Sequence, residues 1–286
     1  MMMRALVLQG GGAKGAYQAG ALKHLLCDLE ISYDIICGIS VGALNGACIA
    51  QFEGGREITA GKALVDLWLS IDNSRVRKKW FFWPFSVPFK PSIFDSRPLH
   101  ALVRKRITGS RIATSGKRFR VSAVSLTTGQ TRTWTELDDD VVEGVLASSA
   151  FPGGLLPIQT PGHWWTDGGV RDMTPLNAAI NAGALEVDVL LLSSPQPSVS
   201  HEEPRTLNVL MRALDLILDE VARNDMERVK LYNELIMHGA HTDKNIIDLR
   251  VLTPDQPLGS TLDFDPERIR TNINAGYEAA KRISWS

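Results

Sequence analysis

A serine between two glycines is the first sign of chemistry in this chain, in the sequence Gly38-Ile39-Ser40-Val41-Gly42. This G-x-S-x-G pattern is typical of a nucleophilic serine that sits on a sharp turn between a strand and a helix. The flanking glycines permit such a turn because they carry no Cβ atom that would clash. A serine that only caps the following helix is the plain structural alternative. The pattern indicates a nucleophile, and the rest of the chain has to supply its partners.

A glycine-rich run, Gly10-Gly11-Gly12-Ala13-Lys14-Gly15, begins thirty residues before Ser40. The backbone N–H groups of such a loop, at the start of a helix, can bind an anion or an oxyanion. The run also matches the G-x-G-x-x-G fingerprint of dinucleotide-binding folds. That fingerprint needs an acid at the end of the second strand, whereas Asp34 lies at the start of that predicted strand. The two patterns together favour acyl transfer, and a nucleotide- or anion-binding scaffold without catalysis stays open as the alternative.

A serine nucleophile needs a group that accepts its proton. The first candidate is Asp167, which lies in Trp165-Thr166-Asp167-Gly168-Gly169 at the end of a predicted strand. A plain Asp-Gly turn is the structural alternative for this segment. An ordinary α/β-hydrolase would instead use a late histidine, which here would be His201, His238 or His241. In that fold the nucleophile follows several strands, whereas Ser40 follows only the second, so this topology fits poorly.

In combination, these motifs resemble the patatin-like phospholipase family. The resemblance rests on the order of the glycine-rich loop, the G-x-S-x-G serine and the later Asp-Gly-Gly. Two further segments, Ala147-Ser148-Ser149-Ala150-Phe151-Pro152 and Ile273-Asn274-Ala275-Gly276-Tyr277, are also similar to patterns of that family. The similarity is good over residues 4–182 and only general over the remainder.

The resemblance implies a Ser40–Asp167 catalytic dyad in place of a triad. Ser40 would attack an ester carbonyl, Asp167 would accept its proton, and an oxyanion hole would hold the negative charge. The backbone N–H groups of that hole would be those of Gly11, Gly12 and Val41. The positions that support the three motifs are Gly10, Lys14, Gly15, Gly38, Gly42, Gly168 and Gly169. The family usually has arginine where this chain has Lys14, and lysine lacks the planar guanidinium fork. The implied substrate is a phospholipid or lysophospholipid ester, with no cofactor and no metal.

The elements that must position these residues alternate between strands and helices. Strands are predicted at residues 4–9 and 33–37, and helices follow at 15–29 and 41–52. Two such units in a row are typical of a parallel sheet that helices cover on both faces. We therefore expect a three-layer α/β/α fold with a mostly parallel central sheet, patatin-like in its outline.

The later sequence continues this alternation. Further helices are predicted at 58–71, 97–107, 138–149, 175–182 and 205–236, and further strands at 119–126, 131–135, 163–166, 187–192 and 246–252. Thr174 is the expected N-cap of the helix that starts at Pro175, and Asp265 the expected N-cap of a C-terminal helix. The acidic run 138–140 is expected to be the solvated start of its helix. We expect one domain over residues 1–286, with core motifs in 4–182 and a C-terminal extension in 205–286.

The composition sets limits on possible partners. The 286 residues are 44% hydrophobic and carry a formal net charge of −1, so no general attraction to nucleic acid is expected. No apolar run approaches the length of a membrane span, and the N-terminal apolar residues are too few for a signal peptide. The three cysteines, Cys27, Cys37 and Cys48, are expected to be buried free thiols. This expectation fits a reducing compartment, and we expect a cytoplasmic protein.

One local patch departs from this neutral background, between Arg75 and Phe89. Basic residues there lead into the aromatic run Trp80-Phe81-Phe82-Trp83-Pro84-Phe85. Basic and aromatic side chains side by side suit peripheral contact with a lipid interface. The alternative is a cap whose aromatic rings pack over the active site or fill the core. Both interpretations stay open from the sequence.

Overall fold

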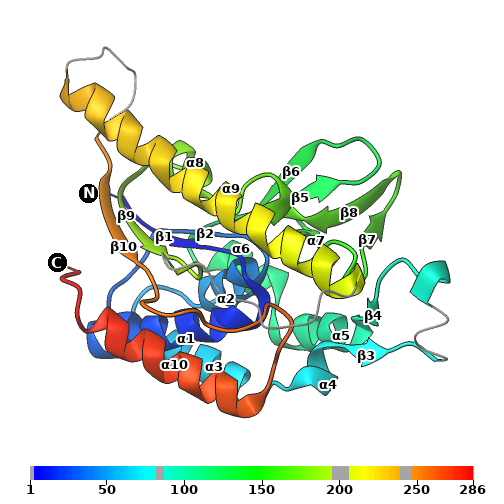
Figure 1. Ribbon diagram of the computed structural model, residues 1–286. Coiled ribbons are helices and arrows are strands. Elements are labelled where there is room, and N and C mark those ends of the chain that lie inside the picture. Colours follow the sequence, from blue (N-terminus) through cyan, green and yellow to red (C-terminus); the bar gives the residue numbers. More distant parts are fainter. Residues whose placement is uncertain (1–2, 82–86, 195–205, 239–245, 286) are drawn as a thin grey trace.

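Figure 1 shows the computed structural model of the chain, which describes residues 3–81, 87–194, 206–238 and 246–285. Its central sheet has eight strands in the order β10-β9-β1-β2-β5-β8-β7, with β6 paired to β5. The strands are β1 (Met3–Leu8), β2 (Ile35–Gly38), β5 (Arg118–Ser125), β6 (Thr131–Thr135), β7 (Ile158–Thr160), β8 (His163–Asp167), β9 (Ala184–Leu190) and β10 (Asp248–Leu252). The strands from β10 to β5 are parallel, whereas β6, β7 and β8 pair in antiparallel fashion. The predicted mostly parallel sheet is confirmed.

Helices cover both faces of this sheet (Figure 1). One face carries α1 (Gly15–Lys23), α2 (Val41–Ala50), α3 (Glu57–Leu69) and α10 (Pro266–Ala280), and the other carries α8 (Leu176–Asn181) and α9 (Thr206–Met237). The alternation of β1 explains why both layers form. Leu6 and Leu8 belong to the larger apolar core with α1 and α2, whereas Ala5 and Val7 belong to a second core with α8. The part of β1 that is buried on both faces, residues 5–8, is therefore apolar at every position.

The register of the strands brings the candidate residues to one level. Gly38 pairs with Leu8 on one side and with Val121 on the other. Asp167 pairs with Ala123, two residues further along β5. Ser40 lies two residues after Gly38, so the serine and the carboxylate emerge at the same height of the sheet. This edge holds the carboxyl ends of the parallel strands, where ligands bind in such folds.

The remaining elements surround this edge. They are η1 (Gly12–Lys14), η2 (His24–Asp28), α4 (Asn73–Val76), β3 (Lys78–Lys79), η3 (Val87–Phe89), β4 (Phe94–Asp95), α5 (Arg97–Arg106), α6 (Gly109–Thr114), α7 (Val141–Ser148) and η4 (Gly168–Val170). η2 is a π-helical turn that continues α1. β3 and β4 form a small antiparallel pair in a region where the sequence shows no periodicity.

The C-terminal elements join the same sheet and core. β10 pairs with β9, and α10 packs closely against α1. A Cβ atom on Gly20 would lie 1.8 Å from the carbonyl oxygen of Ile273, and one on Gly276 would lie 1.9 Å from that of Tyr17. Only glycine permits this approach of the two helices. The segment 273–277, which resembles a family pattern, therefore serves to pack α10 against α1.

Two of the expected helix starts are wrong, and one is confirmed. α8 begins at Leu176, so Pro175 rather than Thr174 occupies the N-cap position, and the buried Thr174 hydroxyl has no hydrogen-bond partner among the described residues. α7 begins at Val141, and Asp138 instead accepts hydrogen bonds from the backbone and hydroxyl of Thr135. Asp138 thus stabilises the end of the β5–β6 hairpin. The Asp265 cap is confirmed by bonds of 3.0 Å from the next helical N–H groups.

The cysteines are free thiols, and two of the three lie in the core. Cys37 and Cys48 are buried, and burial raises the pKa of each thiol to about 12. Cys27 is only half-buried, because it lies at the edge of the π-helical turn, so the expectation of full burial is wrong there. No helix among the described residues is long and apolar enough to cross a bilayer.

Candidate active site

Ser40 lies in a strained turn between β2 and α2. Its φ is 55° and its ψ is −125°, a conformation that costs a non-glycine residue about 1–3 kcal/mol. The flanking glycines allow the chain to pass through this turn. A Cβ atom on Gly38 would lie 2.3 Å from the carbonyl oxygen of Gly42, and one on Gly42 would lie 2.2 Å from that of Leu8. The G-x-S-x-G pattern therefore forms the predicted strand–turn–helix.

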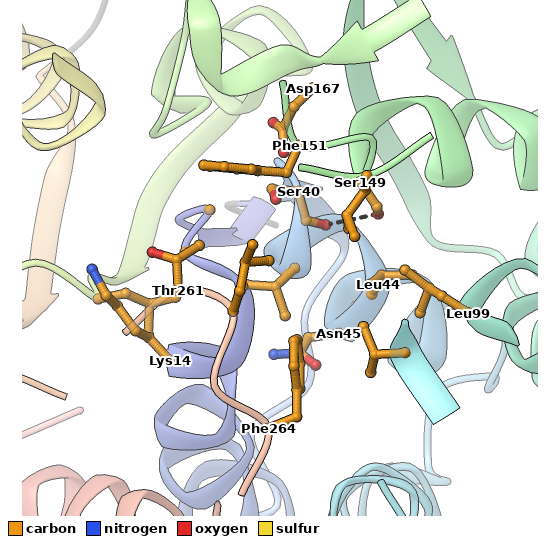
Figure 2. A pocket seen from close by; sticks show the side chains of 18 of the residues that line it. Lys14, Ser40, Leu44, Asn45, Leu99, Ser149, Phe151, Asp167, Thr261 and Phe264 are labelled. Atoms are coloured by element: carbon orange, nitrogen blue, oxygen red, sulfur yellow. Dashed lines mark hydrogen bonds between the residues drawn. The ribbon is translucent and has the colours of Figure 1, made fainter. Parts of the chain in front are cut away.

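Two serines at the end of α7 hold the backbone of Ser40. The Ser148 hydroxyl accepts a hydrogen bond of 3.0 Å from the Ser40 N–H. The Ser149 hydroxyl donates to the Val145 carbonyl at 2.8 Å and to the Ser40 carbonyl at 3.4 Å, the bond drawn in Figure 2. The sequence pointed to segment 147–152 only through resemblance, with no role attached to it. Its position beside Ser40 shows that role, which is to fix the strained peptide.

Asp167 ends β8 and points toward Ser40 (Figure 2). Its backbone N–H donates to the Ala150 carbonyl at 3.0 Å, and its carboxylate accepts a bond of 2.8 Å from the Gly169 N–H. The carboxylate faces the Ser40 side chain, whose interaction with it lowers the pKa of Asp167 against the effect of burial. A Cβ atom on Gly168 would lie 2.3 Å from the Ser122 carbonyl oxygen, so the Asp-Gly-Gly turn is packed tightly against β5. The structure therefore brings the predicted serine and aspartate together.

The Asp167 carboxyl group has an unusual proton affinity. Burial raises its pKa from 3.8 to about 7, and the hydrogen bonds from Ser40 and Gly169 offset only part of that rise. A carboxylate in bulk water is a weak base toward a hydroxyl group, whereas a pKa near neutrality suits general acid–base catalysis at neutral pH. The apolar surroundings therefore give Asp167 the basicity that an exposed aspartate lacks.

The glycine-rich loop lies beside the same pair. The backbone N–H groups of Gly11, Gly12 and Val41 donate hydrogen bonds to no other described residue, and all three residues line one pocket with Ser40. The position of the loop is set by the chain near Thr261, whose carbonyl accepts the Ala13 N–H at 2.8 Å. A Cβ atom on Gly12, where φ is 57°, would lie 2.1 Å from that same oxygen. The sequence therefore needs glycine at position 12 for both conformation and space.

The pocket is polar at the Ser40 end and apolar beyond it. It encloses about 1050 Å³ when the open solvent at its mouth is included. Its apolar wall comes from α2, α3, α5 and the chain before α10, with Leu44, Leu67, Leu99, Val103 and Phe264 among the lining residues. Figure 2 shows Leu44 and Leu99 on the same side of Ser40. These apolar side chains suit a hydrocarbon chain, and Arg106 at the C-terminal end of α5 also lines the pocket.

A chain of buried amides lies next to this wall. The Asn45 side chain donates to the Gln18 side chain at 3.0 Å and accepts a bond of 2.8 Å from the Trp68 indole N–H. The Gln18 amide in turn donates to the Gln9 carbonyl at 2.9 Å. These bonds link α1, α2 and α3 to the start of the glycine-rich loop. Buried amides that are fully bonded fix one arrangement of the elements, and no sequence pattern indicates this set.

The competing sequence interpretations gain no support from the geometry. Asp34 lies at the amino end of β2, away from the glycine-rich loop, and accepts the Arg4 N–H at 2.9 Å. His238 is exposed just after α9, whereas His201 and His241 lie outside the described residues. Within the part of the chain that the structure describes, no histidine lines the pocket. Lys14 lines it beside Thr261 rather than between Ser40 and Asp167 (Figure 2).

The long helix α9, which sequence reasoning left without a role in the chemistry, also takes part in this site. Leu218 of α9 lines the pocket, and Asp225 of the same helix accepts the N–H groups of Met173 and Thr174 at 3.1 and 3.2 Å. The Met173 carbonyl accepts the Gly10 N–H at 3.2 Å. α9 therefore supports both the turn after Asp167 and the glycine-rich loop. No signal in the sequence separates Asp225 from the other acids of this helix.

Comparison with known proteins gives a consistent family. The family model described as "Patatin-like phospholipase" matches residues 6–180, more than half of the chain. The chain is 28% identical over 182 residues to rat patatin-like phospholipase domain-containing protein 7, an alignment that covers 63% of this chain and 13% of that protein. It is 25% identical over 192 residues to the uncharacterized protein YjjU of Escherichia coli, covering 65% of this chain and 51% of that protein.

The chain thus spans about half of the bacterial relative and a much smaller part of the animal one. Among solved structures, VipD from Legionella pneumophila superposes with a TM-score of 0.48 and 12% sequence identity. That alignment covers 98% of this chain and 66% of the other.

Proposed function

This chain belongs to the patatin-like phospholipase family, and on that premise we propose that it is a serine acyl hydrolase that cleaves lipid esters through a Ser40–Asp167 dyad. The observation that supports the proposal is a buried aspartate that faces a strained serine at the polar end of an apolar pocket. A serine that merely capped α2 would not need this partner, and its side chain forms no cap hydrogen bond with the helix. The pairing therefore favours a nucleophile and its base.

In the first half-reaction, the Ser40 oxygen attacks the ester carbonyl carbon while its proton passes to the Asp167 carboxylate. The carbonyl oxygen becomes an oxyanion, and the N–H groups of Gly11, Gly12 and Val41 are the donors available to it. One such donor can contribute about 3 kcal/mol to lowering the barrier. The tetrahedral intermediate then expels the alcohol, which takes the proton from Asp167. An acyl group remains on the serine oxygen.

In the second half-reaction, water attacks the acyl-serine carbonyl and gives its proton to Asp167. The same three N–H groups hold the second oxyanion. The intermediate then releases the fatty acid, and the proton on Asp167 returns to the Ser40 oxygen. One carboxyl group therefore acts in turn as base and as acid, for which a pKa near neutrality is suited.

The pocket favours an ester with a long acyl chain. The lining beyond Ser40 is formed mainly by leucine, valine, tryptophan and phenylalanine side chains, most of them from α2, α3 and α5, together with the polar side chains of Asn45 and Arg106. The alcohol half of the ester would lie toward the polar end, where Lys14, Thr261 and Ser193 also line the pocket. A phospholipid or lysophospholipid fits this division into an apolar chain and a charged head group. A short water-soluble ester would react at the dyad without contacting the apolar wall of the pocket, so we expect only modest rates on such substrates.

The proposal can be tested with an activated fluorophosphonate probe, which labels a nucleophilic serine. We expect labelling of the wild-type chain, none of Ser40→Ala, and normal labelling of Ser110→Ala, a variant at the surface helix α6. A panel of phospholipids and lysophospholipids, followed by mass spectrometry of released fatty acid, would then identify the substrate. Unchanged ester hydrolysis in Ser40→Ala would overturn the proposal. Tight nucleotide binding without labelling would favour the anion-binding scaffold instead.

A further inference from the structure

A second feature of the pocket edge is a segment of extreme composition. Residues 73–94 contain five basic side chains, Arg75, Arg77, Lys78, Lys79 and Lys90, and no acidic one. They also contain seven of the sixteen phenylalanine and tryptophan residues of the chain. Because the whole chain has a formal charge of only −1, this segment is a local positive patch on a nearly neutral protein.

The described part of this segment forms a projection, which we call the aromatic arm and define as residues 77–81 and 87–95. The arm contains β3, β4 and η3, and Figure 1 shows these elements at one edge of the molecule. Its two sides are joined by the pairing of Lys78 with Asp95 and by a bond of 2.9 Å from the Trp80 indole N–H to the Ser92 carbonyl. The Lys90 ammonium lies 5.0 Å from the centre of the Trp80 ring.

The arm presents apolar and basic side chains to solvent at once. Phe81 is 83% exposed and Phe89 is 88% exposed, the two highest exposures among the large apolar side chains of the described residues. Lys78, Lys79 and Lys90 are also exposed. Exposed phenylalanine rings are costly in water, and their position next to lysines is typical of surfaces that meet a lipid interface.

The base of the arm is attached to the wall of the pocket. The Ile93 and Phe94 N–H groups donate to the carbonyls of Gly153 and Gly154 at 2.8 and 3.1 Å, just before Leu155. The Arg77 guanidinium donates to the Leu262 carbonyl at 2.8 Å. Leu155 and Leu262 both line the pocket. An external surface that binds the arm would therefore also lie next to the pocket.

We propose that the aromatic arm docks the protein on an anionic phospholipid bilayer, with Phe81 and Phe89 inserted among the lipids and Lys78, Lys79 and Lys90 at the head groups. A bilayer supplies apolar depth and negative charge over one flat surface, and the arm offers matching groups to both. Docking would bring the pocket to the layer that contains lipid esters. The purpose of the docking rests on the proposed function, whereas the binding itself does not.

The test is co-sedimentation of the full chain with lipid vesicles, using the Ser40→Ala variant so that no lipid is consumed. Vesicles of phosphatidylcholine alone are compared with vesicles that contain about 30% phosphatidylglycerol, at about 0.1 M and about 0.5 M salt. We expect binding to the anionic vesicles, weakened by salt. Changing Lys78, Lys79 and Lys90 to glutamine should lower the partition constant on the order of 100-fold. The control changes Lys62, Lys105 and Arg111, three exposed basic residues outside the arm, to glutamine.

A second pair of variants tests the apolar part. Phe89→Ser should reduce binding at both salt concentrations, whereas Leu137→Ser, which changes an exposed leucine outside the arm, should not. Equal binding by the arm and control variants would overturn the proposal. So would binding to neither vesicle, or a concentration-dependent dimer in ultracentrifugation that Phe89→Ser abolishes. Hydrolysis of a soluble ester by protein with Ser40 intact is measured separately, so a failed dyad and a failed arm give different results.

Discussion

The Ser40 end of the pocket and the aromatic arm, whose base bonds to segments that line the pocket, are held in opposite ways. At Ser40, backbone atoms approach so closely that Gly38 and Gly42 have no room for a side chain, and neighbouring serines bond the peptide. In the arm, Phe81 and Phe89 are almost fully exposed, and the hydrogen bonds that join the arm to the rest of the protein lie mainly at its base. Catalysis requires reacting groups at fixed positions, whereas contact with a fluid lipid surface requires only that apolar and basic side chains are exposed.

The comparison predicts that substitutions at the two places differ in kind. Changes at the Ser40 end should alter turnover or stability, because the Ser40 peptide and the Asp167 carboxylate have specific partners there. Changes in the arm should alter partitioning to membranes and leave the folded chain unaffected.

The largest effect is expected from Asp167→Asn. An amide cannot accept the Ser40 proton, so turnover of a soluble ester should fall on the order of 1000-fold. In the wild type, kcat/KM should rise with pH up to a plateau above about pH 7, because only the deprotonated carboxylate acts as base. Asp34→Asn is the matched control, at the far end of β2, and should change turnover less than about twofold. A normal rate for Asp167→Asn would remove the aspartate from the mechanism.

The same substitution should stabilise the fold at high pH. Folding raises the pKa of Asp167 from 3.8 to about 7, so the folded state holds its proton more tightly than the unfolded state. The unfolding free energy of the wild type therefore falls as pH rises from about 4 to 7. The asparagine side chain of Asp167→Asn does not ionise, so the variant does not lose stability in this way. Its unfolding free energy should exceed that of the wild type by about 4 kcal/mol at pH 8 and by almost nothing near pH 4. Urea unfolding at both pH values measures it, and a gain independent of pH would rule out the ionisation of a buried carboxyl group as the cause.

Ser148→Ala should have a smaller effect on both stability and rate. It removes the acceptor of the Ser40 N–H and leaves that buried group unsatisfied, at a cost of about 1–3 kcal/mol. Because the nucleophile is then less fixed, kcat on a soluble ester should fall on the order of 10-fold with little change in KM. Ser110→Ala, on the surface helix α6, should alter neither quantity. A loss of stability with unchanged kcat would show that Ser148 only supports the fold.

Leu99→Trp is expected to change selectivity rather than chemistry. Leu99 lines the apolar wall, and a larger ring there shortens the space for an acyl chain. We expect kcat/KM for long-chain esters to fall on the order of 10-fold relative to short-chain esters. Leu137→Trp, at an exposed position, is the control. An equal loss on both chain lengths would mean that acyl chains do not use this wall.

The smallest effect is expected in the arm itself. Phe89→Ser should leave the unfolding free energy within about 0.5 kcal/mol of the wild type and the hydrolysis of soluble esters unchanged. Thermal unfolding and a soluble-ester assay measure these quantities. A marked loss of stability would show that Phe89 packs against the fold, which would remove the contrast between the two regions.

Sequence patterns predicted the elements near the chemistry better than the supports around them. The turn at Ser40 and the glycine-rich loop could be predicted from short local motifs. The groups that hold them, which are Ser148 and Ser149 at Ser40 and the Thr261 carbonyl at Gly12, come from distant segments. The predicted N-cap at Thr174 is wrong because Pro175 occupies that position. The predicted helix start at Asp138 is wrong because its carboxylate accepts a hydrogen bond from Thr135 at the end of a hairpin. Such competition depends on which elements meet in space.

The sequence by itself determined the fold class, the family and the order of the three motifs, since alternating apolar segments and short glycine patterns are local properties. Only the tertiary structure decided which groups surround the serine. Ser148, Asp225 and Thr261 come from segments far apart in the chain, and their roles follow from strand register and helix packing. The elevated pKa of Asp167 likewise arises from burial, a property of the assembled core that no single segment contains.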